Sequence, residues 1–154
     1  MELEKIILDI QKKHFPELEG LDICLKPKGH MSHAMEVSAF FPKIFFDESW
    51  VNKFDKVEIK ATVVHELCHL VQFRKMSLFQ KVVLYIKVEF LKDLKCLSHL
   101  EKEADRMVIG KGYGRQIAKA RRRAWKIASK ESLKRRRQIY YSPEELEKLI
   151  KQMK

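Results

Sequence analysis

Hydrophobic positions at the start of the chain follow first the period of a helix and then the alternation of strands. The helical pattern covers Leu3, Ile6, Ile7 and Ile10. It predicts an amphipathic helix that ends near Phe15 and Pro16. Residues 21–26 are predicted as a strand. A second strand is predicted over residues 35–41, where the apolar positions alternate at Met35, Val37, Ala39 and Phe41. Residues 44–46 are predicted as a third strand.

The helix predicted at residues 57–73 is apolar over most of its circumference but carries one continuous polar face. At about 100° per residue, that face holds Glu58, Thr62, His65, Glu66, His69 and Gln72. A helix that is apolar nearly all round is predicted to be buried. Its polar groups then need partners, which a metal site in a cleft supplies. The alternative is a pair of core histidines held by neighbouring carbonyl or carboxylate groups.

Residues 76–91 are apolar, but the segment is too short and too charged to span a bilayer. We expect it to pack as a core helix that returns the chain to the metal. The alternative is a helix that lies in a membrane surface. That alternative rests on an apolar stripe of Phe79, Val82, Val83, Ile86 and Phe90.

The last third of the chain changes in composition. Residues 111–137 hold twelve Lys or Arg and one acid, Glu131, and they supply most of the net charge of +11. Such a segment can bind nucleic acid or an anionic membrane surface. It can equally be a solvated basic helix that packs on the rest of the molecule. A final helix is predicted from Ser142, an N-cap followed by Pro143, to Met153.

Together these elements predict an α+β fold, with a small N-terminal, mostly antiparallel sheet packed on the helix 57–73 and followed by helices. We expect one domain at 1–112 and a basic helical extension at 113–154, packed on it or trailing from it. Three widely spaced cysteines argue against a disulfide framework. Without a signal-peptide pattern or a transmembrane segment, we expect a cytoplasmic protein.

The polar face contains the pentapeptide His65-Glu66-Leu67-Cys68-His69. Histidines four residues apart project from one side of a helix and can hold one metal ion. Glu66 lies beside them, where it can act as general base and acid on a water that the metal activates. This pattern is typical of zinc sites that hydrolyse peptide bonds. Cys68 is expected to be a small packing residue.

A catalytic zinc usually has three protein ligands and one open position, so a third ligand must come from elsewhere. Glu101 is the favoured candidate, with Asp105 on the same helix face and next to a ligand imidazole. Two alternatives remain. Ser98 and Glu101 also form the pattern of a capping box, and His99 is a less favoured ligand.

HELCH at residues 65–69, followed after a helical insert by EKEAD at residues 101–105, resembles the gluzincins, a group of zinc metallopeptidases. The ExxxD spacing is similar to that of the HtpX-like and CAAX-processing peptidases and of the small minigluzincins. The resemblance covers roughly residues 22–114. It implies a zincin-like fold with one Zn²⁺ bound by His65, His69 and Glu101. A looser likeness exists to the repressor-cleaving peptidases that pair HExxH with ExEA.

We therefore expect a zinc endopeptidase acting on a peptide or protein substrate. An added substrate strand could pair along residues 35–41, with Val37, Ala39 and Phe41 at the edge, although a plain core strand is equally consistent. Candidates for stabilising the oxyanion are Tyr113, His99, Tyr140 and Tyr141. Two other functions remain open. One is a peptidase acting at DNA or a membrane surface, and the other is a metal-stabilised scaffold without turnover.

Overall fold

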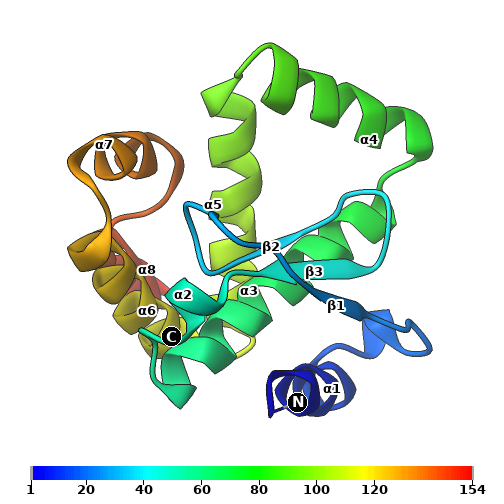
Figure 1. Ribbon diagram of the computed structural model, residues 1–154, viewed down its shortest axis with the longest axis horizontal. Coiled ribbons are helices and arrows are strands. Elements are labelled where there is room, and N and C mark those ends of the chain that lie inside the picture. Colours follow the sequence, from blue (N-terminus) through cyan, green and yellow to red (C-terminus); the bar gives the residue numbers. More distant parts are fainter. Residues whose placement is uncertain (1, 154) are drawn as a thin grey trace.

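The computed structural model describes residues 2–153 and is α+β, with far more helix than strand. Figure 1 shows the arrangement of these elements. In chain order they are α1 (Glu2–His14), the 3-10 turn η1 (Pro16–Leu18), β1 (Cys24–Pro27), β2 (Met35–Val37), β3 (Lys43–Phe46), α2 (Glu48–Val51), α3 (Lys56–Lys75), α4 (Leu78–Tyr85), the π-helical η2 (Ile86–Phe90), α5 (Leu94–Gly110), α6 (Gly114–Ile127), α7 (Lys130–Ile139) and α8 (Pro143–Gln152).

The sheet is mixed, which corrects the prediction of a mostly antiparallel one. Its order is β1-β3-β2, with β1 parallel to β3 and β2 antiparallel to β3. The loop after β1 carries the chain past the position of β3, and β3 then enters between the two earlier strands. As a result β2 is an edge strand.

The strand predicted over residues 35–41 ends at Val37, so Ala39 and Phe41 lie in a turn and not in a strand. The cause is local. The hydroxyl of Ser38 accepts hydrogen bonds from the backbone N–H groups of Phe40 and Phe41, both at 3.3 Å. Such side-chain acceptors compete with a strand ladder, and Pro42 has no N–H to donate to one.

Helix α3 is the centre of the molecule, with α1, β2, α5 and α6 packed around it. It begins at a capping box, in which Asp55 accepts from the backbone of Glu58 and the Glu58 side chain accepts from the backbone of Asp55. Its apolar side chains are fully buried at Ala61, Val63, Val64 and Leu67. The prediction of a buried helix over residues 57–73 is confirmed. Cys68 is part of the same core, and burial raises the pKa of its thiol to about 12.

The basic C-terminal segment packs on this core. Ile117 and Ala118 of α6 and Leu146 of α8 belong to the same buried cluster as the α3 side chains. Basic residues also pair with acids of other elements, as Lys119 does with Asp55. Lys119, Arg121 and Arg123 of α6 each pair in this way with an acid that precedes the C-terminal segment.

The segment formed by α4 and η2 does not pack as the core helix that the sequence predicted. Phe79 is 77% exposed and Phe90 is 71% exposed, and α4 contains no buried residue. In Figure 1, α4 runs along the top of the molecule, far from α1. The core beside the sheet is already filled by α3. The chain turns at Lys92, which has a φ of 51°, and α5 then returns to the core.

Within residues 2–153, no helix combines the length and the apolar character that crossing a bilayer requires. Cys24, Cys68 and Cys96 are all free thiols.

Candidate metal centre

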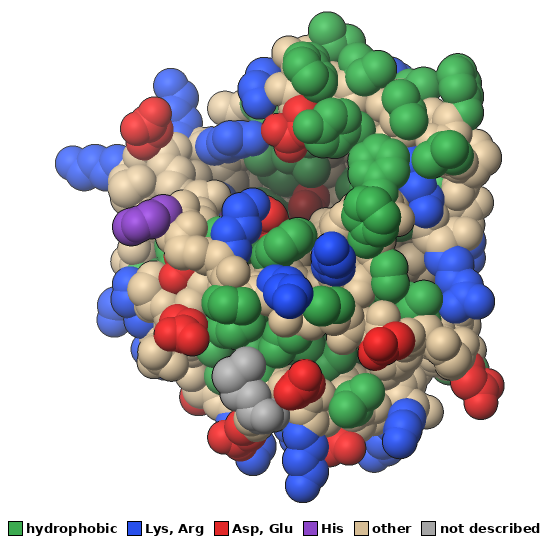
Figure 2. Space-filling view, turned by 45° about the vertical axis from the view of Figure 1, so that its right-hand side comes forward, with side chains coloured by type: hydrophobic (Ala, Val, Ile, Leu, Met, Phe, Trp, Pro, Cys, Tyr) green, Lys and Arg blue, Asp and Glu red, His purple; other side chains and the backbone are tan. Residues whose placement is uncertain are grey.

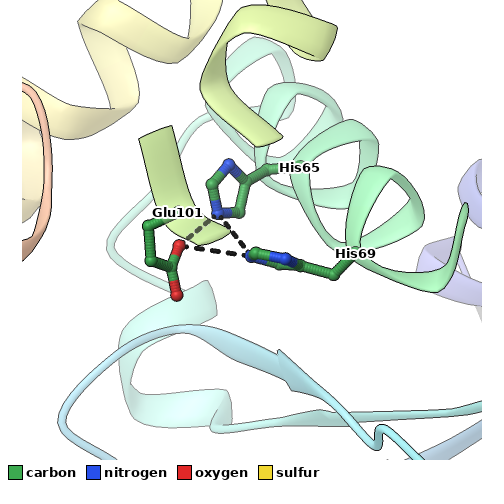
Figure 3. Close-up of side chains that lie close together, drawn as sticks. All are labelled: His65, His69 and Glu101. Atoms are coloured by element: carbon green, nitrogen blue, oxygen red, sulfur yellow. Dashed lines mark hydrogen bonds and ion pairs between the residues drawn. The ribbon is translucent and has the colours of Figure 1, made fainter. Parts of the chain in front are cut away.

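Three side chains from α3 and α5 converge on one point. Figure 3 shows His65 and His69 extending from α3 toward Glu101 on α5. The Nε2 atoms of the two imidazoles lie 3.1 Å apart. Oε2 of Glu101 lies 2.9 Å from Nε2 of His65 and 3.2 Å from Nε2 of His69. All three side chains are buried. The predicted helical spacing thus does bring the two histidines to one site, together with the favoured third residue.

The far side of each imidazole faces an acceptor. Nδ1 of His65 lies 3.1 Å from Oδ1 of Asp105, and Nδ1 of His69 lies 2.7 Å from Oε1 of Gln72. These acceptors favour the tautomer with hydrogen on Nδ1, which leaves a lone pair on each Nε2. Gln72 is itself fixed, because its amide nitrogen donates to the carbonyl of Leu100 (3.1 Å) and to Glu103 (2.8 Å).

Two nitrogen lone pairs and a carboxylate oxygen pointing at one another require a positive charge between them. Ligand atoms about 2.0–2.1 Å from a tetrahedral ion lie roughly 3.3 Å from one another. The separations of 2.9, 3.1 and 3.2 Å are close to that value. The donor set therefore fits a divalent transition-metal ion with an open coordination position.

The pKa values of the three side chains report the same attraction for positive charge. Burial lowers the pKa of His65, but Asp105 and Glu101 outweigh it and raise this pKa to about 10. At His69 burial also opposes protonation, and the Glu101 carboxylate still raises the pKa. Burial raises the pKa of Glu101, but the two imidazoles together hold it well below its usual range. The site stabilises a cation, whether a proton or a metal ion carries the charge.

Glu66 lines the cleft beside this cluster. It is 6% exposed. Within the described chain, its carboxylate has no hydrogen bond or ion pair. Burial raises its pKa, which moves the carboxyl toward the range in which a group can both accept and return a proton near neutrality.

The capping alternative for Glu101 is wrong, because α5 begins a full turn earlier than that alternative requires. Its N-cap is Asp93, whose side chain accepts from the backbone N–H groups of Lys95 and Cys96. Ser98 is therefore inside the helix. His99 is exposed and does not line the cleft, so it is not placed to bind the ion.

Arg121 completes a buried chain of charges behind the histidines. Its guanidinium donates to Oδ1 of Asp105 at 2.8 Å, and it is stacked 4.2 Å from the ring centre of Tyr140. Both Arg121 and Asp105 are buried. In the sequence, Arg121 is only one member of a basic cluster, Arg121-Arg122-Arg123. The only feature that points to its burial is its spacing, three residues after Ala118 and four after Ile117. That spacing places it on the same side of the helix as these two apolar residues.

A cleft of about 1050 Å³ opens in front of the converging side chains. Figure 2 shows the cleft as a hollow in the upper half of the molecular face drawn there, with an acidic side chain at the bottom of the hollow. Its walls are the edge strand β2, the α4–η2 segment and parts of α3, α5, α6 and α7. Val37 and Ala39 line it beside β2, whereas Phe41 is 61% exposed and lies outside it.

Of the four candidates for oxyanion stabilisation, only Tyr140 lines the cleft. The hydroxyl of Tyr113 lies 3.1 Å from Nε2 of His14, on α1. Tyr141 instead accepts a hydrogen bond from Arg106 at 2.9 Å. The expectations for Tyr113 and His99 are therefore wrong, because each side chain is on a surface that the cleft does not reach.

Comparison of the chain with protein-family models, with curated proteins and with solved structures finds no match.

Proposed function

We propose that this protein is a zinc-dependent metalloendopeptidase with His65, His69 and Glu101 as metal ligands and Glu66 as general base and acid. One observation carries the proposal. The Nε2 atoms of both histidines and a carboxylate oxygen converge within 3.2 Å, while Glu66 lies beside them without a partner in the described chain. A core histidine pair would not require an unpaired buried glutamate at the same place.

Two imidazoles and one carboxylate, with a fourth position left open, are a ligand set that catalytic zinc sites use. When bound, zinc lowers the pKa of a water molecule and polarises the carbonyl of the scissile bond. Glu66 takes up the proton that this water loses and returns it to the nitrogen of the leaving amine. Asp105 and Gln72 keep the imidazoles in the tautomer and orientation that bind the ion.

Tyr140 is the side chain that we assign to the developing oxyanion. It lines the cleft, and burial raises the pKa of its phenol above the ordinary range. The hydroxyl therefore keeps its hydrogen at neutral pH and can donate it to an anionic oxygen. Arg121, stacked on the same ring, adds positive charge nearby.

The substrate of this activity is an extended peptide segment that adds to the open edge of β2. That strand is the wall of the cleft next to α3, and its outer edge has no strand neighbour in the described sheet. Backbone hydrogen bonds along such an edge bind a chain with little demand on its sequence. Apolar side chains such as Phe40 and Leu84 in the lining then favour apolar substrate residues.

The decisive test replaces Glu66 with Gln and measures two quantities. Zinc per chain, determined by mass spectrometry of the purified protein, should remain as in the wild type because no ligand is lost. Cleavage of fluorescently labelled, unfolded casein should fall about 10²–10⁴-fold because the base is lost. Glu89→Gln is the matched control, since Glu89 is a glutamate at the cleft rim outside the ligand cluster. Unchanged cleavage by Glu66→Gln would refute the mechanism, and zinc binding without cleavage by the wild type would favour a scaffold.

A further inference from the structure

The outer face of α4 and η2 is the largest concentration of exposed apolar side chains in the described chain. Tyr85 of α4 is 47% exposed but lines the cleft; the other large apolar side chains there that are more than two-fifths exposed are Leu78 (71%), Phe79 (77%), Val82 (41%), Ile86 (43%), Phe90 (71%) and Leu91 (69%). We call these six residues the outer apolar face. Exposed apolar residues scattered singly are ordinary, but a contiguous group of this kind marks a surface that binds something.

Figure 2 shows hydrophobic side chains gathered at the upper right, over the α4 region, with Lys and Arg side chains among and around them. The sequence of this region agrees. Residues 74–95 contain six basic residues, Arg74, Lys75, Lys81, Lys87, Lys92 and Lys95. The acids of the same stretch are Glu89, which lies 3.7 Å from Lys92, and Asp93, which caps α5. The face is therefore apolar at its centre and positive at its margins.

The outer apolar face is also separate from the apolar side chains that line the cleft. Leu84 and Val88 of the same segment belong to the cleft lining and are half-buried. The segment is thus apolar on two sides. One side forms a cleft wall, and nothing in the described chain covers the other.

We propose that the outer apolar face binds the surface of an anionic lipid bilayer, with the α4–η2 segment lying in the interface. Phenylalanine and leucine side chains at helical spacing, with lysines beside them, are the composition that such interfacial helices require. A second copy of the chain fits less well, because two molecules of net charge +11 would bring their positive margins together. Nucleic acid fits less well too, since its phosphates gain nothing from six apolar side chains.

This surface adds a location to the proposed peptidase without depending on its chemistry. Tyr85 lies at the cleft, with its ring 6.0 Å from that of Phe40 and 5.9 Å from that of Phe90 on the outer apolar face. Binding through that face therefore places the cleft mouth beside the lipid headgroups. Peptide segments close to the bilayer would then be within reach of the cleft.

The test is cosedimentation of the full-length protein with vesicles of phosphatidylcholine alone or mixed with phosphatidylglycerol. The wild type should bind the mixed vesicles, and raising the salt concentration should weaken that binding. The double variant Phe79→Ser/Phe90→Ser should lower the partition coefficient about tenfold or more, because two large apolar contacts are lost. Leu8→Ser is the matched control, since Leu8 is a 47% exposed residue of α1. Glu66→Gln should bind as the wild type does, which separates this inference from the catalytic one.

Both substituted phenylalanines are exposed, so the double variant should fold, and its circular dichroism and melting temperature verify this. Three results would overturn the proposal. The first is absence of wild-type binding to anionic vesicles, and the second is equal binding by the double variant. The third is a wild-type dimer in light scattering that the double variant converts to a monomer, since the face would then bind a second copy.

Discussion

Helix α3 and the α4–η2 segment follow each other in the chain and are both rich in apolar residues, yet their environments are opposite. On α3 the side chains of Val63, Val64 and Leu67 are fully buried. On the next segment Phe79 and Phe90 are more than two-thirds exposed. What separates them is the number of neighbours, because α3 is enclosed by α1, β2, α5 and α6 whereas the outer side of α4 faces no described element. Apolar content alone therefore does not decide which helix becomes the core.

The enclosure of α3 and the exposure of the α4–η2 segment suit the two to different roles at the cleft. The two histidines of the candidate metal centre belong to α3, and the far side of each imidazole faces an acceptor. A helix enclosed in this way can keep ligand atoms within a few tenths of an ångström of the required positions. The α4–η2 segment supplies a cleft wall and an exposed surface, for which such fixed positions are not required.

The largest effect on stability is expected where the enclosure of α3 depends on a buried charge pair. Arg121→Met leaves the fully buried carboxylate of Asp105 without its guanidinium partner, which should lower the free energy of unfolding by about 3–5 kcal/mol. Arg122→Met removes a pair with Glu147 whose side chains are more than half exposed, and it should cost at most about 1 kcal/mol. Denaturant unfolding of both variants measures the difference. Equal effects would mean that the pair behind α3 does not stabilise it.

A second prediction tests the contrast between the two helices directly. Leu67→Ala creates a cavity in the core and should cost about 2–5 kcal/mol in unfolding free energy. Phe79→Ala removes a larger side chain from an exposed position and should change stability by less than about 0.5 kcal/mol. Thermal and denaturant unfolding give both values. A loss of several kcal/mol for Phe79→Ala would show that α4 packs against something in solution. The two helices would then not differ in burial as described.

The buried helix was predictable from the sequence, whereas the exposed one was not. The polar face of residues 58–72 interrupted an otherwise apolar circumference, and this feature distinguishes a cleft-lining core helix from a plain one. Residues 76–91 had a similar apolar stripe, but no feature of their sequence indicates whether another element covers that stripe. The strand 35–41 failed for a different reason, because the hydrogen bonds of Ser38 end the ladder within three residues. The mixed sheet depends on long-range pairing, which no local pattern encodes.

The candidate site shows the same division between local and long-range information. The spacing of His65, Glu66 and His69 is a property of one helix and was predictable. Glu101 and Asp105 required only that a second helix face the first. Arg121 comes to Asp105 from a third helix, and in the sequence it stands within a run of three arginines. Only the packing of α6 selects it from that run, so sequence patterns could not identify its role.

A third prediction uses one glutamine from each helix. Gln72→Leu on α3 removes the acceptor at Nδ1 of His69 and should weaken zinc binding about 10–100-fold. Gln80→Leu on α4 removes a backbone cap at Ser77 and should leave zinc affinity unchanged. Competition with a zinc-sensitive fluorescent chelator measures both affinities. A similar loss for both variants would indicate that α4 supports the metal site as much as α3 does.

The smallest effect is expected at β2, which forms another cleft wall and is intermediate in burial between α3 and α4. Hydrogen bonds from His33, at 3.1 Å, and from Lys28 outweigh burial and lower the pKa of Glu36 to about 2. A carboxyl whose folded pKa is depressed stabilises the fold above its unfolded pKa near 4.5. That stabilisation is lost as the pH falls toward 2. Because the side chain is 34% exposed, solvent screening keeps it below about 1 kcal/mol.

Glu36→Gln should therefore be slightly less stable than the wild type at pH 6, and the difference should shrink steadily below pH 4.5. Urea unfolding at a series of pH values measures it. Glu89→Gln, whose partner Lys92 is 3.7 Å away on an exposed surface, should match the wild type throughout. If Glu36→Gln lowered the free energy of unfolding as much as Arg121→Met does, β2 would be enclosed by its neighbours as α3 is. Its edge would then be too constrained to admit an added substrate strand.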